Sequence, residues 1–207
     1  MSSRSGPTTT TALLDALKDE GNSPVWVEFD ARFRPILHGF ARKLGLNAED
    51  AADVAQQALT EFVRDYRSGM YQKGRGRLSS WLISIARNRA VDIQRGQGRR
   101  KEWRGESALD QVSGGSEMQD PAQLTAIWDA EKKHAVLAAA LTELRSISKM
   151  SESTIKAFEL VAIRGVPTAA AAKECGISVD EVYVSKNRVT KQLREIVSRI
   201  AEAYEDA

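Results

Sequence analysis

The chain has 207 residues, of which 42% are hydrophobic and 28% are charged, as in an ordinary globular protein with one or two small domains. No apolar run approaches the length of a membrane span, and the N-terminus lacks the apolar stretch of a signal peptide, so we expect a cytoplasmic protein. A single cysteine, Cys175, excludes an internal disulfide, and the two histidines, His38 and His134, stand alone. We therefore expect neither a metal site nor a cofactor.

Positive charge is concentrated in one segment of the chain. Residues 73–104 hold ten basic and two acidic side chains, a net charge of +8, whereas the whole chain is only +2 and the remainder is therefore −6. Aromatic residues, among them Trp81 and Trp103, are interleaved with the cations. Cations suit phosphates and aromatic rings suit exposed bases, so the segment indicates a nucleic-acid partner. A solvated basic helix is the alternative, and it accounts less well for so one-sided a run.

The N-terminal part of the chain predicts a tail followed by a helix. Residues 1–22 open with small polar residues without periodicity, and we expect them to form a disordered tail. Ser23 and Pro24 suit an N-cap and the first position of a helix. Apolar residues then recur every three or four positions, which predicts a long helix that is kinked at Pro35 and ended by Gly45.

Two more helices are predicted in the same domain. Asn47 can cap the first of them, and acidic residues in its first turn suit the helix dipole. This helix has a broad apolar side and an opposite polar side, formed by Asp50, Asp53, Gln57 and Glu61. The glycine-rich residues 68–77 are predicted to form a loop. A third helix is expected over residues 78–95, with Leu78, Trp81, Leu82, Ile85 and Ala86 facing inward.

A change of composition divides the chain into two domains. Residues 105–127 contain four acidic and no basic side chains, together with glycines and a proline, which predicts a flexible acidic linker. The linker separates an N-terminal domain, residues 23–104, from a C-terminal domain, residues 128–203. No segment alternates between apolar and polar residues for long enough to form a strand. The sequence therefore predicts an all-α fold of two small helical domains.

The C-terminal domain contains a predicted helix-turn-helix. An alanine-rich helix over residues 169–174 is followed by a turn at residues 175–177 and by a longer helix that Ser178 can cap. We expect Val182, Val189 and Leu193 to form the buried side of this second helix. The side chains then left for the major groove of DNA are Tyr183, Lys186, Asn187, Arg188 and Lys191. An ordinary helical hairpin is the alternative.

The two domains, in this order, resemble a sigma factor of the ECF (extracytoplasmic function) group, the small initiation subunits of bacterial RNA polymerase. The resemblance rests on AEDAADVAQQALTEFV (48–63) and GRLSSWLISIARNRAVDIQR (76–95), and on GVPTAAAAKECGISVDEVYVSKNRVTKQLRE (165–195). The pattern V-Y-V-x-K-x-R-V in the last segment is similar to that of a planctomycete-type subgroup. Leu78 replaces an aromatic residue of the family pattern. In the recognition helix, Asp180 and Glu181 are acidic and Tyr183 replaces a frequent lysine, so the bases that this helix reads are left open.

The resemblance implies binding partners and assigns roles to residues. The partners are core RNA polymerase, through its largest-subunit clamp and its flap, promoter DNA, and an anti-sigma factor. The residues that would dock on the clamp are Asp50, Asp53, Gln56, Gln57 and Glu61. The residues that would hold the start-proximal promoter element are Tyr71, Arg75, Arg77, Arg87, Asn88, Arg95, Arg99 and Arg100. The residues that would read the upstream element are Ser178, Tyr183, Lys186, Asn187, Arg188 and Lys191. Either Tyr71 or Trp81 could stack on a base, although Trp81 lies on the apolar stripe. A solvated face is the alternative for the acidic helix.

Three rival functions fit less of the sequence. An enzyme is not expected, because the chain has no phosphate-binding glycine loop, no nucleophile and histidine pair, and no HExxH motif. A helix-turn-helix regulator that acts without core polymerase would account for the C-terminal domain alone. A polymerase-binding adaptor would bind core polymerase without starting transcription.

Overall fold

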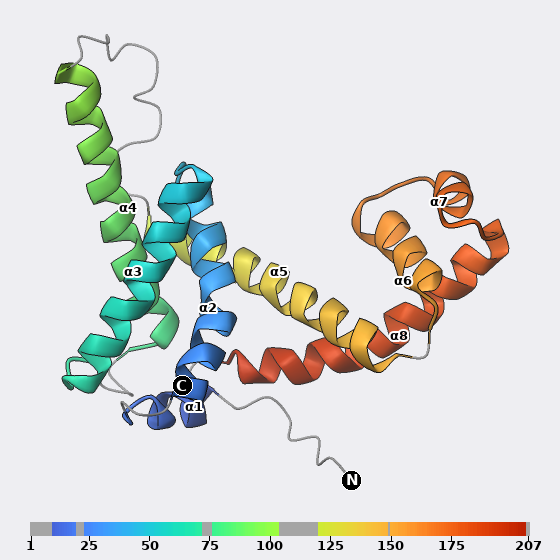
Figure 1. The fold of residues 1–207 in the computed structure, drawn as a ribbon, viewed down its shortest axis with the longest axis horizontal. Coiled ribbons are helices and arrows are strands. Elements are labelled where there is room, and N and C mark those ends of the chain that lie inside the picture. The colour runs from blue at the N-terminus through green and yellow to red at the C-terminus, as the bar shows by residue number, and fades with distance from the viewer. Residues whose placement is uncertain (1–9, 20–22, 72–75, 104–119, 149, 206–207) are drawn as a thin grey trace. The chain divides into compact units, whose positions relative to one another are not determined.

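The computed structural model describes residues 10–19, 23–71, 76–103, 120–148 and 150–205 (Figure 1). Within these ranges helices are the only regular elements, which confirms the all-α prediction. The chain divides within helix α5 into an N-terminal unit, residues 10–135, and a C-terminal unit, residues 136–204. Among the described helices, none combines the length and the apolar character that crossing a bilayer requires.

The N-terminal unit is built around three long helices. These are α2 (Ser23–Lys43), α3 (Ala48–Arg67) and α4 (Leu78–Trp103), and α3 packs against both of the others. α2 continues through Pro35 without interruption, and the turn after it contains Gly45 at a φ of 92°, a conformation that glycine adopts without strain. The predicted cap of α3 is confirmed, because the Asn47 side chain accepts a hydrogen bond of 2.9 Å from the backbone N–H of Asp50.

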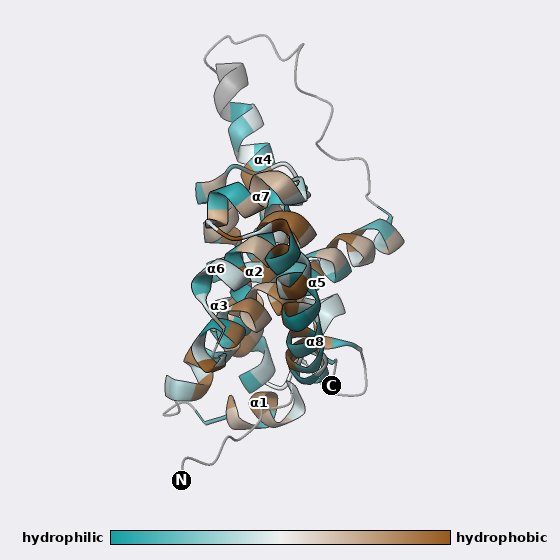
Figure 2. Cartoon of the chain, turned by 90° about the vertical axis from the view of Figure 1, so that its right-hand side faces the viewer, coloured by the Kyte–Doolittle hydropathy of each residue, from teal (hydrophilic) through white to brown (hydrophobic). Residues whose placement is uncertain are grey.

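Aromatic side chains form the core of this unit. Phe29 on α2 stacks on Phe62 of α3 with ring centroids 5.5 Å apart, and Phe62 stacks in turn on Tyr66 at 5.9 Å. Leu78 and Leu82 of α4 are fully buried, as their spacing predicted. Each helix therefore buries one face and leaves the other to solvent, and Figure 2 shows brown apolar and teal polar residues side by side along the helices.

The prediction of a disordered tail over residues 1–22 was wrong for the part that the structure describes. Residues Thr10–Ala16 form helix α1, and Leu13, Leu14 and Leu17 are each only 1% exposed. Arg67 on α3 donates a hydrogen bond of 2.9 Å from its Nε to the Leu17 carbonyl, which satisfies an end of this helix. So short a helix is marginal by itself, and burial of the three leucines stabilises it.

The linker also ends earlier than its composition predicted. Helix α5 (Pro121–Ile147) begins inside the expected linker, while residues 104–119 lie outside the described residues. The Asp120 side chain accepts a hydrogen bond of 3.0 Å from the backbone N–H of Ala122, and Pro121 occupies a position where a helix tolerates proline. Trp128 is 2% exposed and meets Phe40 of α2 edge-on at 6.3 Å. The first half of α5 therefore belongs to the N-terminal unit.

The C-terminal unit comprises the second half of α5 and four further segments. These are α6 (Glu152–Phe158), the π-helix η2 (Glu159–Ile163), α7 (Thr168–Cys175) and α8 (Val179–Ala203). Their main apolar cluster joins Leu144 of α5 and Phe158 of α6 to Val189 and Leu193 of α8. A second cluster joins α6, α7 and α8 through Ala157, Ala172 and Val182. The two clusters together fix the angle at which α8 leaves the turn.

Candidate nucleic-acid interface

A row of polar and cationic residues, with one tryptophan among them, runs along α4 from the residue before its first turn. Positions 77, 81, 88, 95 and 99 are separated by four or seven residues, close to one or two helical turns, so they lie along one line of the helix. The residues of this α4 strip are Arg77, Trp81, Asn88, Arg95 and Arg99. All except Trp81 are exposed, and the three arginines form no ion pair within the described part of the chain. Their guanidinium groups are therefore available to phosphates.

The two predicted stacking residues lie together at the start of the α4 strip. Tyr71 is only 4% exposed and meets Trp81 edge-on, with ring centroids 5.6 Å apart. Its hydroxyl donates a hydrogen bond of 3.2 Å to the Gly76 carbonyl. Trp81 is half-buried, and its indole Nε1 is enclosed without a hydrogen-bond partner in the described ranges. Trp81 is thus the more accessible of the two rings, with Tyr71 supporting it from within the core.

The side of α4 that faces α3 is held by polar contacts. Arg89 forms an ion pair with Glu61 of α3, which raises the pKa of Arg89 above its ordinary value. Gln97 donates a hydrogen bond of 2.7 Å to the Asp50 side chain of α3. Asp50 and Glu61, two of the residues predicted to bind the polymerase, therefore contact α4, and they fix the orientation of the α4 strip.

The other three predicted docking residues lie on the exposed ridge of α3. Asp53, Gln56 and Gln57 are all exposed. Gln56 accepts a hydrogen bond of 2.5 Å from Arg34 of α2, and Arg34 is held in place by Asp30, whose side chain raises the pKa of Arg34. The ridge is therefore contiguous with α2, and we call these three residues the α3 ridge.

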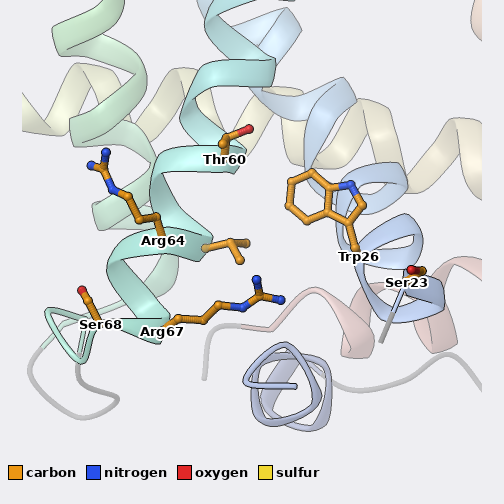
Figure 3. A pocket seen from close by; sticks show the side chains of 7 residues that line it. Ser23, Trp26, Thr60, Arg64, Arg67 and Ser68 are labelled. Carbon is orange, nitrogen blue, oxygen red and sulfur yellow. The ribbon is translucent and has the colours of Figure 1, made fainter. Parts of the chain in front are cut away.

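A pocket of about 650 Å³ lies near the C-terminal end of α3, between α2 and α3 (Figure 3). Trp26 of α2 faces Thr60 of α3 across it, and Arg67 extends from α3 toward α2. Because Arg67 also binds the Leu17 carbonyl, helix α1 is tied to one side of this pocket. The pocket could not be predicted from residue patterns, because it depends on the way two helices meet.

The predicted helix-turn-helix is confirmed in the C-terminal unit. Helix α7 ends at Cys175 and is capped by Gly176, whose φ of 65° is left-handed and suits glycine, and α8 begins at Val179. Ser178 and Glu181 form a capping box: the Ser178 Oγ accepts from the Glu181 N–H, and the Glu181 carboxylate accepts from the Ser178 N–H at 2.7 Å. This backbone hydrogen bond is the main cause of the lowered pKa of Glu181.

The side chains predicted to read the upstream element project from α8. The exposed ones are Tyr183, Lys186, Asn187, Arg188 and Lys191. Arg188 and Lys191 also line a hollow of about 720 Å³ with Met150 from the α5–α6 connection. Ser178 differs from the others, because its hydroxyl takes part in the capping box. Ser178 therefore stabilises the start of α8, and it lies at the edge of the predicted interface.

Two predicted residues cannot be placed. Arg75 lies outside the described residues, and nothing is described of the Arg100 side chain. Arg87 is half-buried on the flank of α4, away from the α4 strip. Within the described residues, no three His, Cys, Asp or Glu side chains are placed to hold a metal ion.

Comparison with known proteins identifies a family that matches the helices carrying the α4 strip and the α3 ridge. Residues 30–100, which cover most of α2, α3 and most of α4, match the family sigma-70 region 2. This part of the chain is a sigma-70 region 2 domain. The chain is also similar to the ECF RNA polymerase sigma factor RpoE of Cereibacter sphaeroides, to which it is 28% identical over 92 residues. That alignment covers 44% of this chain and 50% of its relative, so the chain spans about half the length of the curated protein that it matches.

Proposed function

We propose that this protein is a sigma factor that binds core RNA polymerase, recognises promoter DNA and promotes strand separation at the start site. The observation that carries the proposal is the α4 strip, in which three unpaired arginines and a half-buried tryptophan lie along one line of a helix within a sigma-70 region 2 domain. The arginines would bind phosphates of the start-proximal element. The chain would act by binding, in the cytoplasm, and not as an enzyme.

The energy of base capture supports a role for Trp81. Extruding a base from a duplex costs a few kcal/mol, and stacking a base on an aromatic side chain contributes about 1–3 kcal/mol. One stacked base can therefore offset much of one unstacking step.

The α3 ridge would dock on the clamp of the largest polymerase subunit. Asp53, Gln56 and Gln57 are exposed, and Gln56 is supported by a hydrogen bond from Arg34 of α2. Asp50 and Glu61 would contribute indirectly, because they hold α4 against α3. The C-terminal unit would contact the flap and present α8 to the upstream element, and an anti-sigma factor would compete for these surfaces. Membership of a planctomycete-type subgroup remains a prediction.

Copurification and run-off transcription distinguish the proposal from its rivals. The purified chain should join core polymerase in stoichiometric amounts, and the complex should start transcripts from a genomic promoter library. A regulator that acts without the polymerase would instead bind duplex DNA alone and fail to join the core enzyme. An adaptor would join the core enzyme and yield no promoter-specific transcript.

A further inference from the structure

The exposed side of α8 contains an acidic residue where a DNA-binding helix is expected to be basic or neutral. Positions 180, 184, 187 and 191 are separated by three or four residues and therefore share one side of the helix. Asp180, Val184, Asn187 and Lys191 are all exposed. Asp180 thus lies at the N-terminal end of the surface that the proposed function turns toward the major groove.

The two acidic residues at the start of α8 differ in their surroundings. Glu181 is engaged in the capping box with Ser178. The Asp180 carboxylate forms no hydrogen bond and no ion pair with any described residue. It is free to meet a partner from outside the chain. As a second-turn neighbour, Val184 is 55% exposed, and Tyr183 beside it is 56% exposed.

A carboxylate in this position weakens binding to phosphates unless it meets a donor on a base. The major groove offers one donor that suits it well, the N4 amino group of cytosine, which Asp and Glu recognise. Once Tyr183 and Val184 are covered by DNA, little water remains to solvate the carboxylate. An unpaired carboxylate would then be costly and a paired one favourable. The N-terminal residues of a recognition helix are also those that reach base edges.

We propose that Asp180 determines the sequence specificity of this protein by accepting a hydrogen bond from the N4 amino group of a cytosine in the upstream promoter element. This inference rests on the proposed function and adds to it the nucleobase that Asp180 recognises. Asp180 also stabilises the first turn of α8 through the helix dipole, and a purely structural role of that kind would affect all promoters alike.

The test is selection of promoters by the full-length chain in complex with core polymerase, from a library randomised in the upstream element. Wild type should enrich cytosine at one position. In Asp180→Ala this preference should fall by about 5-fold or more, while the preferences at other positions persist. Asp180→Asn should shift the preference at the same position toward adenine, because asparagine pairs with adenine N6 and N7. Glu202→Ala removes an exposed acidic residue from the far end of α8 and should select like wild type.

Two results would overturn the inference. The first is the same cytosine preference in Asp180→Ala and Asp180→Asn as in wild type. The second is an increase in binding by both variants that is equal for all sequences, which would show that Asp180 only repels phosphates. If wild type joins core polymerase but enriches no upstream sequence, or does not join it, the proposed function itself fails. Helicity and thermal midpoint, measured on each variant, separate misfolding from altered selection.

Discussion

The arginines of the α4 strip predict a measurable change in the salt dependence of promoter binding. Each phosphate contact contributes roughly 0.7 to the slope of log K against log salt on single strands and roughly 0.9 on duplex DNA. Arg95 and Arg99 are exposed and unpaired in the described structure, so each should account for one contact. Asp92, the acidic residue nearby, forms no ion pair with either arginine in the described structure.

The double variant Arg95→Ala/Arg99→Ala should lower this slope by about 1.4 if the arginines bind a separated strand, and by about 1.8 if they bind duplex. A fourfold rise in salt lowers the affinity of the wild type by a certain factor. For each arginine removed, that factor becomes about 2.6–3.5 times smaller. The assay is equilibrium binding of the polymerase complex to a fluorescent promoter fragment between about 50 and 200 mM salt.

Arg89→Gln is the matched control for this experiment. It removes the same charge from the same helix, but from the side that contacts Glu61 of α3. Its slope should equal that of wild type. A slope that is unchanged in the double variant, or one that falls equally in Arg89→Gln, would refute the assignment of the α4 strip to phosphate binding.

Four further variants test other regions of the protein. Asp53→Lys should abolish association with core polymerase while helicity is retained, and Glu202→Lys, an equal charge change on α8, should not; equal association of both would remove the docking role of the α3 ridge. Leu14→Ala should lower the free energy of unfolding by about 2 kcal/mol or more in urea titration, because this side chain is 1% exposed, and an unchanged midpoint would contradict the docking of α1. Ser178→Ala should cost about 1 kcal/mol of stability in the C-terminal unit. Because the folded-state pKa of Glu181 lies below its ordinary 4.5, its contribution is present above that pH and is lost as the pH falls through the lowered value. The wild type should therefore lose stability more steeply than Glu181→Gln on acidification, and parallel curves would argue against the capping box.

Local signals predicted much of the fold. The sequence predicted the caps at Asn47 and Ser178 and the turn at Gly176, because a cap or a left-handed turn depends on residue types a few positions apart. The buried side of α8 was predicted from the helical spacing of its apolar residues. Helix α1 was missed because three leucines within a single turn are too short a pattern, and the helix depends on contacts with residues far along the chain, such as Arg67.

The candidate site was only partly predictable for a related reason. The sequence places Asp50 and Glu61 on the same polar helix face as Asp53. Only the packing of α4 shows that Gln97 donates a hydrogen bond to Asp50 and that Arg89 forms an ion pair with Glu61. Trp81 satisfies the apolar period and also lies on the α4 strip, so periodicity placed it in the core while the structure leaves it half-buried. Contacts between helices, rather than residue type, decide these roles.

The strongest single test of the account is permanganate footprinting of a promoter with core polymerase and the purified chain. Permanganate oxidises thymines that are unstacked, so it reports strand separation directly. We expect reactive thymines in the start-proximal element only when both proteins are present, and we expect Trp81→Ala to weaken the signal. A template that stays unreactive in a complex that has bound both core polymerase and DNA would contradict it.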